Sequence, residues 1–359
     1  MGRTLVKRYR VGILGATGLV GQRLIERLRD HPWFDVQVVA ASSRSVGRAY
    51  SDAAQWCLDG EVPPGVAGMR VRGCGPADLA GCDLVLSALD SATAREIEPR
   101  LREAGLPVIS NSSAHRMMAG VPLVIPEVNP SQLDLVRAQR ERHGGGFIVT
   151  NPNCSAIGLA LGLAPLHRSY GLKRIVVTTM QAISGAGLDG PRALDLLDNV
   201  VPYIAGEEEK LEQELAKIFG EVEDGVVRPS PLEVSAHCHR VGVRDGHLEA
   251  VSMELGRSVE PEEAVETLRG FTAPGDVGNL PSSVPRPIRV RDEIDRPQPR
   301  LDRNAGEGMA VVIGRVRRCP VLGLKMEVVS HNAIRGAAGG TLLVAELLAE
   351  RGLVGRSGA

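Results

Sequence analysis

Residues 10–30 read RVGILGATGLVGQRLIERLRD, and this stretch decides the fold of the first half of the chain. The apolar run that ends at Leu14 is typical of a buried parallel strand, and helical spacing begins after Gly18. Between them, small residues let backbone amides approach a pyrophosphate at the positive helix N-terminus. The order of strand, turn and helix therefore predicts a dinucleotide site at residues 15–21, with a tight turn that binds nothing as the alternative.

Similar apolar runs, separated by helical patterns, continue along the first half of the chain. They read VQVVAAS (36–42), DLVLSAL (83–89), LPVISNS (106–112), PLVIPEV (122–128) and GGGFIVTNPNC (144–154). This alternation predicts βαβ units in a parallel sheet. The following run, SAIGLALGLAPLHRSYG (155–171), reads as a buried helix, so we expect a domain boundary near residue 153.

Longer strands follow in the second half, which indicates an α+β domain with a mixed or antiparallel sheet. They read RIVVTTMQAIS (174–184), EVSAHCHRVGV (233–243), HLEAVSMEL (247–255) and MAVVIGRVR (309–317). Residues 281–303 are rich in Pro and Arg and are expected to be irregular. Residues 331–352 begin with glycines and then become periodic, which predicts a loop that leads into a C-terminal helix.

The composition of the 359 residues favours a cytoplasmic enzyme that acts on small molecules. Lys and Arg total 42 against 43 for Asp and Glu, so no excess charge attracts nucleic acid or an anionic membrane. The N-terminus lacks the pattern of a signal peptide, and no apolar run is long enough to span a membrane. The six cysteines form no Cys-x-x-Cys pair, so we expect no metal site and reduced thiols.

The end of the second predicted strand bears on the choice of cofactor. NAD enzymes place an acidic residue there, whereas this chain has Ala41-Ser42-Ser43-Arg44-Ser45. A cation and hydroxyls suit a 2′-phosphate, so NADP is favoured. The alternative is that Arg44 is only an exposed loop residue.

Cys154 is the candidate nucleophile. It lies in TNPNCS (150–155), between a predicted strand and a predicted helix, and a helix N-terminus stabilises the thiolate form. The other five cysteines lack this setting. An inert, buried cysteine is the alternative.

Three histidines are candidate bases for that cysteine: His237, His239 and His247. They lie in one strand-and-turn segment with Arg240, which has the geometry to clamp a carboxylate. Spacing alone does not choose among the three.

Two polar segments have a functional and a plain interpretation. GEEEK (206–210) reads as a solvated helix face with ion pairs. SNSSAHR (110–116) follows a predicted strand, where parallel sheets bind ligands, and Arg116 is suited to an anion; a polar surface loop is equally compatible.

Taken together, six motifs resemble the aspartate-semialdehyde dehydrogenase family, in the branch found in archaea and fungi. They are GATGLVG (15–21), SNSSAHR with PLVIPEVNP (110–116, 122–130), TNPNCSAIG (150–158), QAISGAG (181–187), GEEEK (206–210) and RVGVRDGH (240–247). They occur in order over essentially the whole chain. The resemblance implies a Rossmann-type NADP-binding domain (1–153), an α+β catalytic and dimerisation domain (154–331), and a C-terminal helix (332–359) that returns to the first domain.

The resemblance also implies residue roles. Cys154 matches the nucleophile, His247 the acid/base and Gln181 the residue that orients the substrate. Arg240 matches the arginine that binds the α-carboxylate of the substrate, and Glu207 matches the residue that pairs with its amine. The phosphate-binding set is matched by Arg116, Asn153 and Lys210. The implied NADP-binding set is Gly15, Thr17, Gly18, Leu19, Val20, Ser42, Ser43, Arg44, Ser45, Ser184, Gly185 and Asn332.

The chemistry that these residues suit is aldehyde oxidation through a thioester. A thiolate adds to an aldehyde, hydride leaves to a nicotinamide, and phosphate displaces the thiol. The resemblance implies the reverse as the biosynthetic direction: L-aspartyl-4-phosphate is reduced by NADPH to aspartate semialdehyde for lysine, threonine and methionine synthesis. It also implies a homodimer or homotetramer.

The sequence departs from the family at His239 and Gly242, where relatives often have Asn and Pro; this puts fine substrate preference in doubt. N-acetylglutamyl-phosphate reductase shares the scaffold, but its Pro-Gly-Cys-Tyr-type motif differs from Asn151-Pro152-Asn153-Cys154. A malonyl-CoA reductase is a closer alternative, although Glu207 and Arg240 favour an amino acid. A catalytically silent NADP sensor is a third alternative, but it would not need Cys154 together with His247.

Overall fold

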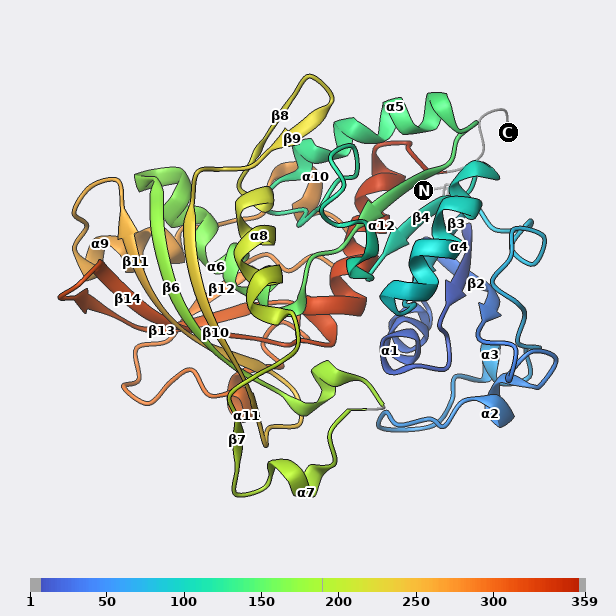
Figure 1. Ribbon diagram of the computed structural model, residues 1–359, viewed down its shortest axis with the longest axis horizontal. Helices are drawn as coiled ribbons and strands as arrows, with labels where there is room; N and C mark the ends of the chain where they lie inside the picture. The colour runs from blue at the N-terminus through green and yellow to red at the C-terminus, as the bar shows by residue number, and fades with distance from the viewer. Residues whose placement is uncertain (1–7, 189, 355–359) are drawn as a thin grey trace, which may run out of the picture. The chain divides into compact units, whose positions relative to one another are not determined.

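The computed structural model describes residues 8–188 and 190–354, drawn in Figure 1. These residues form two compact units, each composed of several stretches of chain. The first unit contains residues 8–122, 133–151 and 341–354; the second contains residues 123–132, 152–188 and 190–340.

The first unit is built on a five-stranded sheet in which every neighbouring pair is parallel. Its strands are β1 (Tyr9–Leu14), β2 (Phe34–Ala40), β3 (Leu84–Ser87), β4 (Pro107–Ser110) and β5 (Phe147–Thr150), in the order β2-β1-β3-β4-β5. This confirms the predicted parallel sheet. Because the chain leaves β1 for β2 on one side and then adds β3 on the other, the direction of winding changes beside β1, where such sheets bind ligands.

The predicted glycine turn joins β1 to α1 (Leu19–Leu28). Gly15 has φ +67°, and a Cβ there would lie 2.5 Å from the carbonyl oxygen of Ala88. A Cβ on Gly21 would lie 2.3 Å from the carbonyl oxygen of Gly15. Both positions exclude a side chain, one by backbone conformation and the other by close packing of helix on turn.

Three longer helices complete the first unit: α4 (Ser91–Glu103), α5 (Leu135–Arg142) and α12 (Gly339–Glu350), the last from Thr341 onward. Asp90 caps α4, because its Oδ1 accepts the backbone N–H groups of Ala92 and Thr93 at 3.0 Å each. Two short helices, α2 (Tyr50–Ala53) and α3 (Pro64–Ala67), lie between β2 and β3. Aliphatic side chains from β1 to β5 form the core.

The prediction of a strand at residues 122–128 was wrong. Leu123, Val124 and Ile125 are buried, but they form no strand. The backbone N–H of Leu123 donates to Gln132 Oε1 at 3.0 Å, and that of Ile125 to Asn129 Oδ1 at 2.8 Å. Side chains therefore satisfy the backbone here, in a segment interrupted by two prolines.

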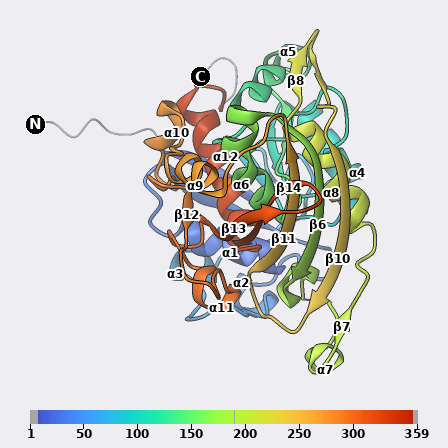
Figure 2. The same ribbon diagram turned by 90° about the vertical axis from the view of Figure 1, so that its left-hand side faces the viewer.

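The second unit is built on a seven-stranded mixed sheet, as predicted for the second half. Its strands are β6 (Leu172–Gln181), β7 (Val200–Val201), β10 (Glu233–Val241), β11 (His247–Leu255), β12 (Ile288–Val290), β13 (Val311–Cys319) and β14 (Gly323–Ser330), in the order β12-β13-β14-β11-β6-β10-β7. The long central strands run side by side in Figure 2. A separate hairpin pairs β8 (Glu221–Glu223) with β9 (Val226–Arg228).

Three helices cover one face of this sheet: α6 (Cys154–Tyr170), α8 (Glu207–Ile218) and α9 (Pro261–Arg269). Residues of the central strands alternate between this face and the other. On β6, Ile175 and Val177 are buried under the helices, whereas Val176 is 44% exposed. The core of the unit thus lies between α6 and the sheet.

Other segments of the second unit are short. The region expected to be irregular, 281–303, contains β12 and a four-residue helix, α11 (Pro299–Asp302). Two further short helices are α7 (Ala193–Leu196) and α10 (Gly275–Gly278). The glycine-rich start of 331–352 forms a π-helix at Ile334–Ala338, which leads into α12. Within residues 8–188 and 190–354, no helix has both the length and the apolarity needed to cross a membrane.

Candidate active site

Cys154 is the first residue of α6, where Asn153 caps the helix. Asn153 Oδ1 accepts the backbone N–H of Ser155 at 2.9 Å and that of Ala156 at 3.4 Å. Cys154 is half-buried, and the positive end of the helix points at its position. The cysteine therefore has the setting that stabilises a thiolate.

His247 lies beside that cysteine. Its Nε2 is 3.1 Å from Cys154 Sγ, and its ring is fully buried. Burial lowers the pKa of His247 to about 3, and Arg240 acts in the same direction. The imidazole is therefore neutral at pH 7.

The backbone at Ala182 fixes the orientation of both basic groups. Its N–H donates to His247 Nδ1 at 3.0 Å, and its carbonyl oxygen accepts from Arg240 Nη1 at 2.7 Å. Because Nδ1 of the neutral ring is an acceptor, the ring proton is assigned to Nε2, which faces the sulfur.

The pleat of β10 turns His237 and His239 away from the site, whereas His247 is the first residue of β11. Arg240 is buried on the face that carries α6 and α8, together with Ala236 and Cys238. His237 and His239 alternate with these residues and point to the opposite face. His247 is thus the histidine that the fold brings to Cys154, and His239 adds no second base beside Arg240.

Glu207 joins the site from the first turn of α8. Its Oε2 accepts from Asn153 Nδ2 at 2.9 Å and from Gln181 Nε2 at 3.4 Å, and its Oε1 lies 3.0 Å from Lys210 Nζ. The Cys154 cluster, as we call it, therefore comprises Cys154, His247, Gln181, Arg240, Glu207, Asn153 and Lys210. The plain interpretation of 206–210 as a solvated face does not hold for Glu207, which is largely buried.

The cluster holds a buried carboxylate and a buried guanidinium. Burial raises the pKa of Glu207, but Lys210, Asn153 and Gln181 together outweigh it, so the pKa is lowered. Burial lowers the pKa of Arg240, against the attraction of Cys154 and Glu207, yet a guanidinium stays charged. The site thus offers one buried negative and one buried positive group beside a nucleophile.

Residues 182–187 and Asn332 enclose this centre within the second unit. A Cβ on Gly185 would lie 2.9 Å from Arg240 Nη1 and 3.2 Å from His247 Cε1, so the position has no room for a side chain. Asn332 links two segments, because its Nδ2 donates to Ser184 Oγ at 2.8 Å and its Oδ1 accepts from the backbone N–H of Gly246 at 2.8 Å.

The remaining candidate residues belong to the first unit. Gly15, Thr17, Gly18, Leu19 and Val20 form the turn after β1 and the start of α1. After β2, Ser42, Ser43 and Arg44 are exposed, whereas Ser45 is buried.

Arg116 directly follows the short 3-10 helix Ser113–His115. It is buried, and its guanidinium donates to the carbonyl oxygen of Asn111 at 2.6 Å. The interpretation of residues 110–116 as a polar surface loop therefore does not hold for Arg116.

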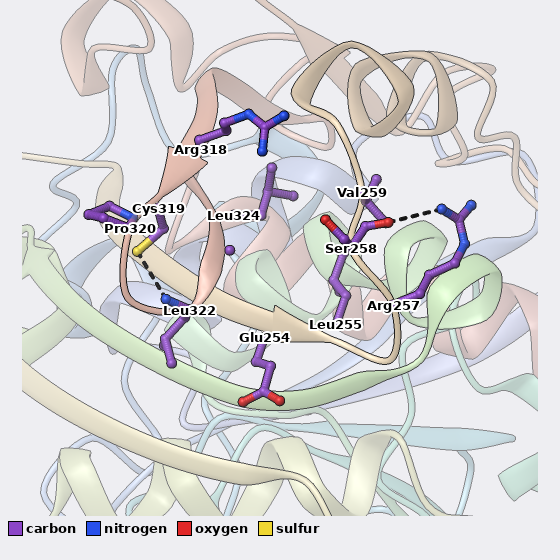
Figure 3. A pocket seen from close by; sticks show the side chains of 11 residues that line it. Glu254, Leu255, Arg257, Ser258, Val259, Arg318, Cys319, Pro320, Leu322 and Leu324 are labelled. Atoms are coloured by element: carbon purple, nitrogen blue, oxygen red, sulfur yellow. Dashed lines mark hydrogen bonds between the residues drawn. The ribbon is translucent and has the colours of Figure 1, made fainter.

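A pocket of about 500 Å³, drawn in Figure 3, is lined by the end of β11 and by the turn between β13 and β14. Arg257, Arg318 and Cys319 line it, and it shares no residue with the Cys154 cluster. Both arginines are paired with carboxylates, Arg257 with Glu263 and Arg318 with Glu260. Its charges are thus satisfied within the protein.

Gly336 contributes to the site but was not among the predicted residues. A Cβ there would lie 2.7 Å from Cys154 Cβ and 2.9 Å from Cys154 Cα. The π-helix at Ile334–Ala338 therefore packs its backbone directly on the cysteine. The only sequence signal was the glycine-rich run HNAIRGAAGG (331–340).

Gly336→Ala is expected to lower kcat at least tenfold, because the new methyl group must displace Cys154. Steady-state kinetics and the rate of Cys154 alkylation by iodoacetamide measure the effect. Gly81→Ala is the matched control, since nothing lies within 4 Å of a Cβ there. Equal kcat and alkylation rates in Gly336→Ala and wild type would contradict this packing role.

Two family models match the chain. The semialdehyde dehydrogenase NAD binding domain matches residues 10–136, and the semialdehyde dehydrogenase dimerisation domain matches residues 163–335. A solved structure of aspartate semialdehyde dehydrogenase with NADP from Candida albicans is similar, with a TM-score of 0.90 and 41% identity. The match covers 97% of this chain and 100% of that one.

Relatives from archaea and fungi are similar over nearly the full length. The aspartate-semialdehyde dehydrogenase of Methanothermobacter thermautotrophicus is 48% identical over 343 residues, which cover 95% of this chain and 99% of the relative. That of Cryptococcus neoformans is 43% identical, with 97% and 98% covered. With its glycine turn, its paired cysteine and histidine, and these similarities, the chain belongs to the aspartate-semialdehyde dehydrogenase family.

Proposed function

We propose that this protein reduces L-aspartyl-4-phosphate to L-aspartate 4-semialdehyde with NADPH and releases phosphate, as a step towards lysine, threonine and methionine. The contact that carries the proposal is the 3.1 Å distance between Cys154 Sγ and His247 Nε2, in a chain of this family. The acidic and basic groups around it suit an amino acid.

In the biosynthetic direction, Cys154 attacks the acyl phosphate. The thiolate forms a C–S bond as the C–O bond to phosphate breaks, which leaves a thioester and free phosphate. The cap at Asn153 and the positive end of α6 favour the thiolate that this step needs.

NADPH, when bound, supplies the hydride that reduces the thioester carbon. His247 faces the reacting centre with its Nε2–H and shares that proton with the oxygen that becomes negative. The proton returns to Nε2 as the carbonyl re-forms and the C–S bond breaks, so aspartate semialdehyde leaves and Cys154 returns as a thiolate. The reverse sequence oxidises the aldehyde and requires phosphate.

Substrate recognition divides between two charges. We assign the α-carboxylate to Arg240, whose guanidinium is fixed by the Ala182 carbonyl, and the amine to Glu207. Gln181 orients the substrate between them. Phosphate is assigned to Arg116, Lys210 and Asn153.

Arg240→Lys is expected to raise the KM for aspartate semialdehyde roughly 100-fold, because an ammonium cannot make the two parallel bonds of a guanidinium. The KM for NADP is expected to stay within about twofold. Initial rates at saturating phosphate measure both. An unchanged KM for the aldehyde would remove Arg240 from the substrate site.

For the cofactor, we propose NADP at the first unit. The turn at Gly15 leaves no room for a side chain, which suits close approach of a pyrophosphate, and Arg44 with Ser42 and Ser43 is exposed and suits a 2′-phosphate. Thr17, Gly18, Leu19, Val20 and Ser45 complete the set in the first unit. The resemblance to the family also implies Ser184, Gly185 and Asn332 for NADP.

The test of the function is NADP reduction by the wild-type enzyme with aspartate semialdehyde, in the presence and absence of phosphate. We expect reduction that depends on phosphate. No turnover of that substrate, but NADPH oxidation with malonyl-CoA, would move the assignment to malonyl-CoA reductase and make Glu207 and Arg240 misassigned charges. A silent sensor would turn over neither, and its Cys154 would be alkylated no faster than Cys57.

We also propose that the enzyme is a homodimer or homotetramer formed through its second unit. Support comes from the matched dimerisation domain and from apolar side chains left exposed there. Those in the described part of 188–203 are Leu188, Leu194 (81% exposed), Leu197, Val200 and Tyr203. Light scattering should give two or four times the chain mass. A cytoplasmic location suits an enzyme whose nucleophile must stay reduced.

A further inference from the structure

A carboxyl group is buried at the carboxyl edge of the first sheet. Glu98 lies on α4, and its side chain is inaccessible to solvent. It faces the ends of β3 and β4, where Ser87 and Ser110 are register partners. Ser110 Oγ donates to Glu98 Oε1 at 2.7 Å. Glu98 takes no part in the proposed reaction.

Ser110 connects Glu98 to the segment that carries Arg116. The same Ser110 Oγ accepts the backbone N–H of Ser112 at 3.1 Å. Ser112 Oγ in turn accepts the N–H of Ala114 at 3.3 Å and so caps the 3-10 helix that leads to Arg116. The carboxyl group thus anchors the base of this loop.

His115 provides a second connection between Glu98 and the loop. Its Nε2 lies 3.4 Å from Glu98 Oε2 and 3.3 Å from the carbonyl oxygen of Ala94, on the same helix. Burial lowers the pKa of His115, against the Ala94 carbonyl and together with Arg102 and Arg95. The ring is therefore neutral and, with its proton on Nε2, donates toward α4.

The charge of Glu98 changes close to neutral pH. Burial raises its pKa to about 7, although the hydroxyls of Ser110 and Ser87 oppose the shift. As a carboxylate it accepts from Ser110, and its Oε2, which accepts no hydrogen bond from the described residues, lies 3.4 Å from His115 Nε2 and attracts the positive end of that N–H. A proton on Oε2 would instead oppose the His115 N–H across 3.4 Å, so protonation weakens one of the two anchors. His115 faces Glu98, and Arg95 and Arg102 face His115.

We propose that Glu98 is a positioning residue for the anion site at Arg116, holding the loop in place for phosphate when it is ionised and releasing it when it is protonated. The inference rests on the proposed function only in taking Arg116 as a phosphate-binding residue. Phosphate binding should consequently weaken as the pH falls from 8.5 to 6.

The test uses sulfate, whose charge is constant over this pH range, and the holoenzyme with NADP. Ligand binding to the folded state raises Tm, so a sulfate titration gives a Kd without turnover. The same titration is made with Arg116→Lys. The part of the increase in Tm that this variant loses is due to sulfate at the Arg116 site, and the part that remains is a general effect of salt. Wild type, Glu98→Gln and Glu96→Gln are compared at pH 6 and 8.5; Glu96 is the control, an exposed residue of the same helix.

For wild type and Glu96→Gln, the Kd for sulfate at pH 6 should be roughly three- to tenfold that at pH 8.5, the effect expected for one weakened polar contact. Glu98→Gln should bind weakly at both pH values, because its amide places an N–H toward His115 as the protonated acid does. Should that variant not fold, Ser110→Ala removes only the bridging hydroxyl and should weaken binding at pH 8.5.

A wild-type Kd that does not change with pH, or the same change in Glu98→Gln, would overturn the proposal. The two possible failures are distinguishable. Absence of phosphate-dependent turnover would refute the proposed function whatever the sulfate data show. Normal turnover with a pH-independent Kd would refute only the role of Glu98.

Discussion

Cys154→Ala is expected to lower the phosphate-dependent rate of NADP reduction roughly 10⁴-fold or more, because no other group at the site can form the thioester. The sulfur lies 3.1 Å from His247 Nε2, and Asn153 caps the helix that begins at this cysteine. The loss should appear in kcat and in kcat/KM alike. Cys154 is half-buried, and alanine fits its volume, so the fold should be retained.

Two controls separate loss of the nucleophile from loss of structure. Cys57→Ala removes an exposed cysteine and should leave the rate unchanged. Binding of NADP, measured by calorimetry, should stay within about twofold in Cys154→Ala. If that variant kept a tenth or more of the wild-type rate, the reaction would not pass through a thioester on this residue.

The second large effect is on stability, at an ion pair in the second unit. Arg335 lies in the π-helix, and both its terminal nitrogens donate to Glu127, at 2.7 and 2.8 Å. Both side chains are at most 1% exposed. Arg335→Met would leave the Glu127 carboxylate buried without its cation, so we expect a loss of about 3–5 kcal/mol in the free energy of unfolding.

Urea denaturation measures this loss, and a double variant identifies its origin. Glu127→Leu combined with Arg335→Met removes both charges and should recover most of the stability. Asp292→Asn breaks the exposed pair with Arg269 and should cost less than about 1 kcal/mol. A loss below about 1 kcal/mol for Arg335→Met would mean that water reaches Glu127 in the folded protein.

Local patterns were enough to predict part of the site. The glycine turn and the parallel sheet could be predicted because each depends on a few consecutive residues. The helix N-terminus at Cys154 could be predicted in the same way. The selection of His247 could not, because it depends on which face of β10 and β11 each histidine occupies and on how those strands pair with β6.

Other features depend on contacts between distant segments, which no spacing reveals. Gly336 meets Cys154 across about 180 residues of chain. The segment 122–128 has the composition of a strand, but side chains of Asn129 and Gln132 satisfy its backbone instead. Apolar composition predicts burial there correctly and secondary structure wrongly.

The contacts made by Ala182 have a consequence for how this enzyme varies and how it is probed. One residue's main chain holds both the proton-handling histidine and the proposed carboxylate clamp. Among codon changes at that position, only one to proline deletes either bond, by removing the N–H, so alanine scanning would miss the group that sets the geometry. Replacing the backbone amide of Ala182 by an ester, which removes the N–H, would measure how much this hydrogen bond to His247 contributes. The relative position of His247 and Arg240 therefore depends on the backbone path at residue 182. Substitutions elsewhere preserve that position only if they leave this path unchanged.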